Sequence, residues 1–186
     1  MPRAGLSTTA VVDAALSIID ERGLDALTLA AVASRTGVAA PSLYKHIGSL
    51  GELRELVSVR LLEEMAERFT AVAIGRSRDD AVAALMREYR AFVMESPNRY
   101  AAMPSDPLHD PALAVAGMKL LNVILAVLRG YGLEKEAAIH ATRCLRVIVH
   151  GFADIEASGG FGLPEDLDES YEQLIRMFLA SLPRNK

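Results

Sequence analysis

The segment from residue 28 to residue 53 constrains the fold more than any other part of the chain. Thr28 is a candidate N-cap for a short helix, because its hydroxyl can accept a hydrogen bond from a backbone N–H of the first turn. Gly37 is expected to end that helix, since glycine adopts the left-handed backbone of a tight turn without steric cost. A second short helix is predicted over residues 40–46, with Pro41 in its first turn. Two short helices joined by a glycine turn are typical of a helix-turn-helix, whose second helix enters the major groove of DNA.

Apolar residues at helical spacing predict long helices in the rest of the chain. Ser49-Leu50-Gly51-Glu52 has the S-x-x-E spacing of a capping box, so a long helix should begin there. Alternating runs typical of strands are absent from the sequence, and the fold class is therefore predicted to be all-α. The first long helix is expected to begin at residue 7 or 8 and to end at residue 22. Five further long helices are expected over residues 49–73, 79–95, 111–128, 134–157 and 167–182.

The composition fits a chain with a sizeable core and no disulfide framework. Apolar residues make up 51% of the chain, and one cysteine excludes an intrachain disulfide and suits a reducing cytosol. The N-terminus lacks the basic and apolar pattern of a signal peptide. The formal net charge of −4 does not favour nucleic-acid binding, and cations and acids up to residue 48 are balanced. We therefore expect modest DNA affinity per subunit and a need for dimerisation.

From Val11 to Leu53 the chain resembles the DNA-binding domain of the TetR/AcrR family of transcriptional regulators. The string Leu43-Tyr44-Lys45-His46 is the most specific part of the match. Ile47 replaces the usual Phe, which should alter packing only. Leu50 replaces a Lys that contacts phosphate in the family, a role that Arg54 could take over. The other matching positions are Val12, Ala15, Leu16, Ile19, Gly23, Thr28, Val32, Ala33, Gly37, Val38, Ser42 and Leu53.

The resemblance places the DNA contacts on the second helix of the turn. Tyr44, Lys45 and His46 are expected to reach phosphates and base edges, although Tyr44 could instead pack inside the head and Lys45 could be merely solvated. Small apolar side chains suit contact with a thymine methyl group, and hydroxyls suit phosphate. Arg3 either enters the minor groove or has no role. The candidate contacts are Thr28, Ala39, Ala40, Pro41, Ser42, Tyr44, Lys45 and His46.

The stretch from residue 111 to residue 128 is apolar except for Lys119 and Asn122. A membrane span is the rival interpretation, but the run is marginal in length, contains a lysine and stands among amphipathic helices. We therefore expect a helix buried at the centre of the body and no membrane partner. Methionine and aromatic side chains around a few polar groups are typical of a core and also of an adaptable ligand pocket. The pocket candidates are Met86, Tyr89, Phe92, Tyr100, Met118, Asn122, Arg143 and Val147.

The last two predicted helices carry surplus apolar surface. The terminal helix has a broad apolar stripe, and the penultimate helix has apolar groups on more than one face. This surplus predicts a four-helix dimer interface, with two helices from each subunit. The dimerisation candidates are Leu145, Ile148, Phe152, Tyr171, Leu174 and Phe178.

A polar stripe also follows the penultimate helix and includes His140, Arg143, His150 and Asp154. It is interpreted either as part of the subunit interface or as a pocket wall. His140 and Cys144 have the i, i+4 spacing of a helical metal pair, but no second ligand pair accompanies them, so no metal or cofactor is predicted. A Cys-His hydrolase dyad lacks an identifiable oxyanion motif.

The resemblance implies a cytoplasmic, homodimeric transcriptional regulator that is not an enzyme. An N-terminal three-helix helix-turn-helix head (residues 1–48) would bind double-stranded operator DNA, and a helical ligand-binding and dimerisation body (residues 49–186) would bind a small apolar or amphipathic effector. The effector would release a repressor from a palindromic operator if it prefers the conformation that does not bind DNA. One alternative is a small helical enzyme or ligand carrier that uses the stripe around His140 and Cys144. The other is a regulator that binds DNA without an effector.

Overall fold

The computed structural model describes residues 6–184, and these residues form helices, turns and loops without a strand. All six predicted long helices are present, so the all-α expectation is confirmed. Arg3 lies outside the described residues. The elements are α1 (Thr8–Arg22), η1 (Leu24–Ala26), α2 (Leu29–Thr36), α3 (Ala40–Leu43), α4 (Leu50–Ala73), α5 (Arg78–Glu95), α6 (Pro97–Ala102), α7 (Ala114–Leu128), η2 (Arg129–Tyr131), α8 (Lys135–Ala157) and α9 (Leu167–Ser181).

The long helices lie within three residues of their predicted bounds, with the largest shift at the start of α7, and two short elements differ more. The helix expected over residues 40–46 is regular only from Ala40 to Leu43, and the chain continues through a turn in which the His46 N–H donates to the Leu43 carbonyl over 2.8 Å. The short helix α6 was not predicted, because its six residues contain less than two helical periods. Proline is also favoured in the first turn of a helix, and this is its position in α6.

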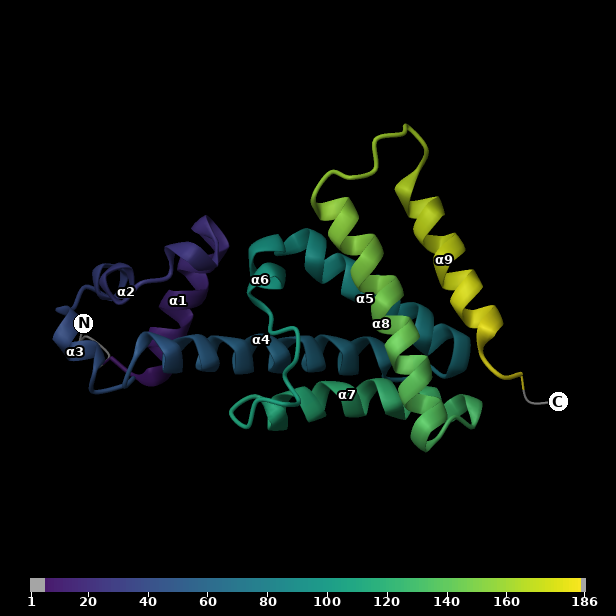
Figure 1. Cartoon of the computed structure of the whole chain (residues 1–186), viewed down its shortest axis with the longest axis horizontal. Coiled ribbons are helices and arrows are strands. Elements are labelled where there is room, and N and C mark those ends of the chain that lie inside the picture. Colours follow the sequence, from purple (N-terminus) through teal and green to yellow (C-terminus); the bar gives the residue numbers. More distant parts are fainter. Residues whose placement is uncertain (1–5, 185–186) are drawn as a thin grey trace. The chain divides into compact units, whose positions relative to one another are not determined.

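The described chain divides into two compact units (Figure 1), each with its own packing. Among the described residues, the first unit comprises 6–63 and 96–117, and the second comprises 64–95 and 118–184. The expected domain boundary at residue 48 does not coincide with this division. Leu53, Val57 and Leu61, in the first half of α4, belong to the core of the first unit, and so does Ala102 of α6.

The core of the first unit forms between α1, α2, α3 and the start of α4. Val11, Ile18 and Ile19 of α1 are fully buried there, together with Val32 of α2 and Leu43 of α3. Val11, Ala15 and Ile18 recur at steps of four and three, which places them on one face of α1. The expected helix-turn-helix is thus built around one apolar cluster.

Local caps define the ends of these helices as the sequence predicted. The Thr28 hydroxyl accepts a hydrogen bond from the Ala31 N–H over 3.1 Å, and Gly37 has the left-handed φ of 68°. At the start of α4, the Ser49 hydroxyl accepts from the Glu52 N–H over 3.0 Å. The Glu52 carboxylate accepts in turn from the Gly48 N–H over 2.6 Å, one residue before the usual partner. Both helix starts are therefore confirmed by their geometry.

The second unit packs α5 against α8 and α9, which also lie side by side (Figure 1). Arg90 of α5 connects all three segments. Its guanidinium donates two hydrogen bonds of 2.6 Å to Glu156 of α8 and one of 2.8 Å to Asp168 of α9. It also lies 5.5 Å from the ring centroid of Phe152 and 5.1 Å from that of Tyr171, within cation–π range. The hydrogen bond to Glu156 raises the pKa of Arg90.

Helix α7 departs from the prediction, because it was expected to be buried on all sides. Asn122 and Met118 are exposed, and only 22% of the segment from Ala114 to Tyr131 is buried. The expectation of an enclosed helix is therefore wrong for the single chain. By length and composition this segment is the one described helix apolar enough to cross a membrane, which is weak evidence, and it contains Lys119 and Arg129.

Candidate nucleic-acid interface

Residues 39–46 form one continuous surface segment of the first unit. It begins after the Gly37 turn, passes through the single turn of α3 and ends before the buried Ile47. Leu43 and Ile47 anchor it from below, with exposed fractions of 0% and 2%. The Thr8 hydroxyl of α1 also donates to the His46 carbonyl over 3.2 Å. The sequence folds this way because two apolar residues four apart hold the turn against the core.

The predicted DNA contacts lie on the outer side of this segment. Tyr44 is 57% exposed, so the alternative in which it packs inside the head is wrong. Ala39, Pro41 and Lys45 are also exposed, whereas Ala40, Ser42 and His46 are half-buried. Thr28 is exposed at the start of α2, where its hydroxyl already accepts the capping bond. The structure therefore brings seven of the eight candidates together in one segment and places Thr28 at a neighbouring helix end.

Charges near this segment are partly neutralised. The Arg35 guanidinium at the end of α2 forms a two-bond ion pair with Glu21 of α1, and this hydrogen bond lowers the pKa of Glu21. Arg60 pairs with Asp13 over 2.9 Å. Leu50 packs half-buried against the core, in the position where the family has a phosphate-binding Lys, and Arg54 is exposed one turn later. Lys45 and Arg54 are both exposed to solvent.

The predicted effector residues do not share one surface. Met86, Tyr89 and Phe92 are buried in the second unit, where Tyr171 donates a hydrogen bond of 2.6 Å to the Met86 carbonyl. Tyr100 belongs to α6 in the first unit. Met118, Asn122, Arg143 and Val147 are exposed. Met86, Tyr89 and Phe92 therefore lie in the core, whereas the last four residues face solvent, and a pocket formed by this set stays a prediction.

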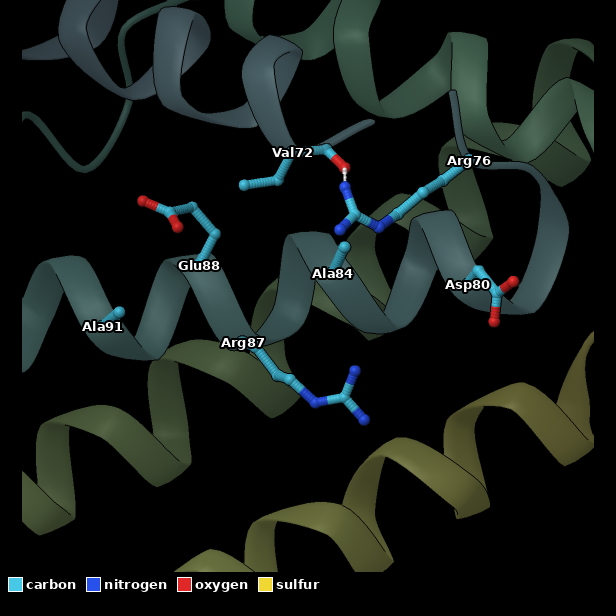
Figure 2. A pocket seen from close by; sticks show the side chains of 7 residues that line it. All are labelled: Val72, Arg76, Asp80, Ala84, Arg87, Glu88 and Ala91. Carbon is cyan, nitrogen blue, oxygen red and sulfur yellow. Dashed lines mark hydrogen bonds between the residues drawn. The ribbon is translucent and has the colours of Figure 1, made fainter. Parts of the chain in front are cut away.

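A groove that the sequence analysis missed lies in the second unit, between the end of α4 and α5 (Figure 2). Its volume is about 400 Å³, within the range of small-molecule sites. Ala84 and Ala91, seven residues apart on α5, leave the space, and guanidinium groups border it. The spacing of these alanines between charged residues is the sequence feature that could have indicated the groove. The lining residues are Val72, Arg76, Asp80, Ala84, Arg87, Glu88 and Ala91.

Two arginines give this groove its polar character. The Arg76 guanidinium donates to the Val72 carbonyl over 2.6 Å, the bond drawn in Figure 2. Arg87 points toward α9 and donates two hydrogen bonds, of 2.6 and 2.7 Å, to Glu172. That contact lowers the pKa of the Glu172 carboxyl. The groove thus combines an alanine-lined floor with edges that contain two arginines and two acids, Asp80 and Glu88.

A second groove, of about 460 Å³, lies at the start of α5. The Tyr131 hydroxyl donates to the Asp79 carboxylate over 2.7 Å, and the Arg78 guanidinium lies 4.9 Å from the Tyr131 ring centroid. Burial and the contact with Asp79 both raise the pKa of Tyr131. The polar groups here mainly bind one another, so this region joins α5 to the turn after α7.

Most of the predicted dimerisation residues are buried inside one chain. Leu145, Phe152, Tyr171 and Phe178 pack in the core of the second unit and cannot also face a partner, so their assignment is corrected. Ile148 and Leu174 are half-buried. The exposed apolar side chains lie on the other face of these helices, where Val147 is 72% exposed on α8 and Met177 is 69% exposed on α9.

The polar stripe of α8 separates into two environments. His140, Arg143 and Cys144 are exposed, whereas His150 is half-buried and its ring nitrogen Nδ1 lies 2.7 Å from the Tyr89 hydroxyl of α5. Burial, followed by the nearby Arg146 cation, lowers the pKa of His150 to about 4. Among residues 6–184, no cluster of three or more His, Cys, Asp or Glu side chains could hold a metal ion.

Comparison with known proteins agrees with this arrangement. Residues 11–55 match the model of bacterial regulatory proteins of the tetR family, and residues 82–178 match the tetracyclin repressor-like C-terminal domain. The chain is 36% identical over 183 residues to the uncharacterised HTH-type transcriptional regulator YobS of Bacillus subtilis. This match covers 97% of this chain and 95% of YobS.

Solved structures show the same fold. A protein of unknown function from Rhodococcus sp. RHA1 superposes with a TM-score of 0.83 at 18% identity, covering 99% of this chain and 100% of that chain. A TetR variant from Acinetobacter baumannii AYE, in complex with minocycline, superposes with a TM-score of 0.71 at 19% identity, covering 95% and 96%.

A helix-turn-helix head followed by a helical body defines a class of DNA-binding transcriptional regulators. Within that class, the chain belongs to the TetR family.

Proposed function

We propose that this chain is a cytoplasmic, homodimeric repressor that leaves its operator when a small amphipathic molecule binds the second unit. The observation that carries the proposal is the exposed segment of residues 39–46, held on a packed helix-turn-helix core by Leu43 and Ile47. A recognition segment needs outward side chains on a rigid support, because base readout requires defined positions. Membership of a family of transcriptional regulators supports this role.

The dimer is proposed to form through the exposed face of α8 and α9. Cys144, Val147, Gly151 and Ile155 recur at steps of three and four on α8, and all four are exposed. A Cβ atom built on Gly151 meets nothing within 4 Å, so the backbone there is open to close approach by another helix. Two copies of such a face can pack about a twofold axis, which also suits a palindromic operator.

The effector is proposed to bind in the groove between α4 and α5. The groove contains alanine side chains for an apolar body and the Arg76 guanidinium for an acidic group. The structural relative that binds minocycline supports effector binding by this fold. To release DNA, the effector must bind the conformation without DNA more tightly than the conformation on DNA.

Gel-shift measurement with purified protein tests this proposal. The protein should retard a specific genomic fragment as a dimer, and a library of amphipathic acids should contain compounds that reverse the shift. Ala84→Trp fills the groove and should abolish the reversal while DNA binding persists. The matched control is Ala137→Trp, which adds the same ring at an exposed position of α8. Equal loss of response in both variants, or reversal that survives Ala84→Trp, would exclude this groove.

A further inference from the structure

We propose that the recognition segment reads its operator through the 5-methyl groups of thymine rather than through hydrogen-bonded guanine or adenine. This inference rests on the proposed DNA-binding function and specifies the base chemistry of the same site. It follows from three observations on residues 36–44: the side chains that are present, their direction, and the state of the nearest cations.

The residues between Arg35 and Lys45 include no side chain for two-point base recognition. Guanine is read in the major groove by the paired donors of Arg or by Lys, and adenine is read by the amide of Asn or Gln. This stretch consists of Thr36, Gly37, Val38, Ala39, Ala40, Pro41, Ser42, Leu43 and Tyr44. Single hydrogen bonds from the hydroxyls of Thr36, Ser42 or Tyr44 do not provide two-point recognition, and apolar contact with the thymine methyl group is the direct readout that the other side chains can supply.

The fold sorts these residues into an inner and an outer set. Leu43 is fully buried, and Val38 and Ala40 pack half-buried against the same core. Ala39 and Pro41 are exposed and lie two residues apart, at the start of the single turn of α3. Two small apolar side chains are therefore both exposed at the start of α3.

Tyr44 extends this apolar surface. Its side chain is 57% exposed, and it follows Leu43 directly, so the buried leucine fixes its position. A phenol ring presents apolar area to a methyl group, and its hydroxyl can form one hydrogen bond with a phosphate or a base. The ring thus adds contact area without the paired donors that select guanine.

The nearby cations do not supply the missing donors. Arg35 is held by two hydrogen bonds to Glu21, which directs its guanidinium toward α1. Lys45 carries a single ammonium group and lies beyond the apolar run, where contact with phosphate needs only a positive charge. A guanine contact by Lys45 is the competing result that the experiment must detect.

Thymine-to-deoxyuridine replacement tests the inference, because it removes the methyl group and leaves base pairing and the hydrogen-bonding edge unchanged. The full-length protein first selects a binding site from random double-stranded DNA. Each thymine of the selected half-site is then replaced in turn. Burial of one methyl group predicts a loss of about fourfold in affinity at each contacted thymine. Deoxyuridine in the flanks should leave affinity unchanged.

A double-mutant cycle assigns the contact to a side chain. Pro41→Ala and Ala39→Gly remove apolar surface and should weaken binding to the thymine site. In each variant, one deoxyuridine replacement that weakens the unmodified protein should have no further effect. Circular dichroism verifies that both variants are folded.

Two outcomes overturn the inference. Affinity that stays within about twofold at every deoxyuridine position excludes methyl readout. The second outcome concerns replacement of guanine by 7-deazaguanine. If this replacement weakens binding of the unmodified protein but not of Lys45→Ala, Lys45 reads guanine instead. If selection enriches no sequence at all, the proposed DNA-binding function fails as well, which is a distinct result.

Discussion

Lys45 is the residue whose charge should matter most to the DNA affinity of the head. It is exposed at the end of the recognition segment. The whole chain has a net charge of −4, so little general electrostatic attraction to DNA adds to this contact. Lys45→Ala should weaken operator binding and reduce the slope of log affinity against log salt concentration by about two, since each subunit of the proposed dimer loses one phosphate contact that releases a counterion. Lys119→Ala, which removes an exposed lysine of α7, is the matched control. Equal salt slopes for both variants and the unmodified protein would remove Lys45 from the interface.

His150 should make the stability of the second unit depend on pH. Burial lowers its pKa from about 6.5 to about 4, so the unfolded chain takes up a proton more readily than the folded chain between these values. The free energy of unfolding therefore falls as pH drops from about 6.5 to about 4, and this contribution is intact above pH 6.5. His150→Gln removes the titrating group, so urea unfolding should show a smaller loss of stability over this range.

The exposed His109 provides the control for this pH experiment. Its side chain is 87% exposed beside Asp106, so His109→Gln is the comparison substitution for a histidine at the surface. If the free energy of unfolding falls equally for His150→Gln and His109→Gln between pH 7 and pH 4, the buried histidine does not cause the pH dependence.

Residues with local roles were predictable from the sequence, whereas residues with tertiary roles were not. Thr28, Gly37 and Ser49 act on backbone groups within four residues of themselves, so their spacing alone predicted the caps. Asn122 was expected in an enclosed site because its neighbours are apolar, but its exposure depends on which helices cover α7. Local sequence does not contain that information.

At the scale of whole elements, Arg90 should be the main polar link between α5, α8 and α9. Its side chain is 17% exposed and that of Glu156 is 8% exposed, so removal of Arg90 leaves a buried carboxylate without its partner. Arg90→Met should lower the free energy of unfolding by about 3 kcal/mol, measured by urea denaturation.

Arg87 offers a matched comparison on the same helix. It also makes two hydrogen bonds to a glutamate of another helix, but its side chain is 54% exposed. Arg87→Met should therefore lower the free energy of unfolding by no more than about 1 kcal/mol. Similar losses in the two variants would mean that burial of the ion pair does not determine its contribution.

Long helices were predicted well because their apolar period extends over several turns, as in α1, α4 and α5. The short α6 was missed for the opposite reason, since six residues contain less than two periods. Its place depends on contacts with α1, including two hydrogen bonds of 2.7 and 2.9 Å from Arg99 to Asp20. Such distant partners are invisible to a search for periodicity.

For the whole molecule, periodicity also failed to separate the core face of the last helices from the proposed partner face. Tyr171 and Phe178 of α9 form a strong apolar stripe, and both are buried against the rest of one chain. The proposed interface is less apolar and includes Met177 on the same helix. A stripe predicts that something covers it, but not whether the cover comes from the same chain or from a second copy.

Val147→Glu tests that assignment directly. Val147 is 72% exposed in the single chain, so a carboxylate there is solvated in a monomer but buried without a partner in a dimer packed through α8. Sedimentation velocity should show folded monomers of Val147→Glu, and binding to a palindromic operator should weaken because two half-sites are no longer bound together. Val115→Glu is the control, since Val115 is an 83% exposed valine of α7 outside the proposed interface, and it should remain a dimer. Leu145→Glu places the same charge on the buried face of α8 and should unfold the second unit instead. If Val147→Glu sediments as an intact dimer, the subunits meet through another surface.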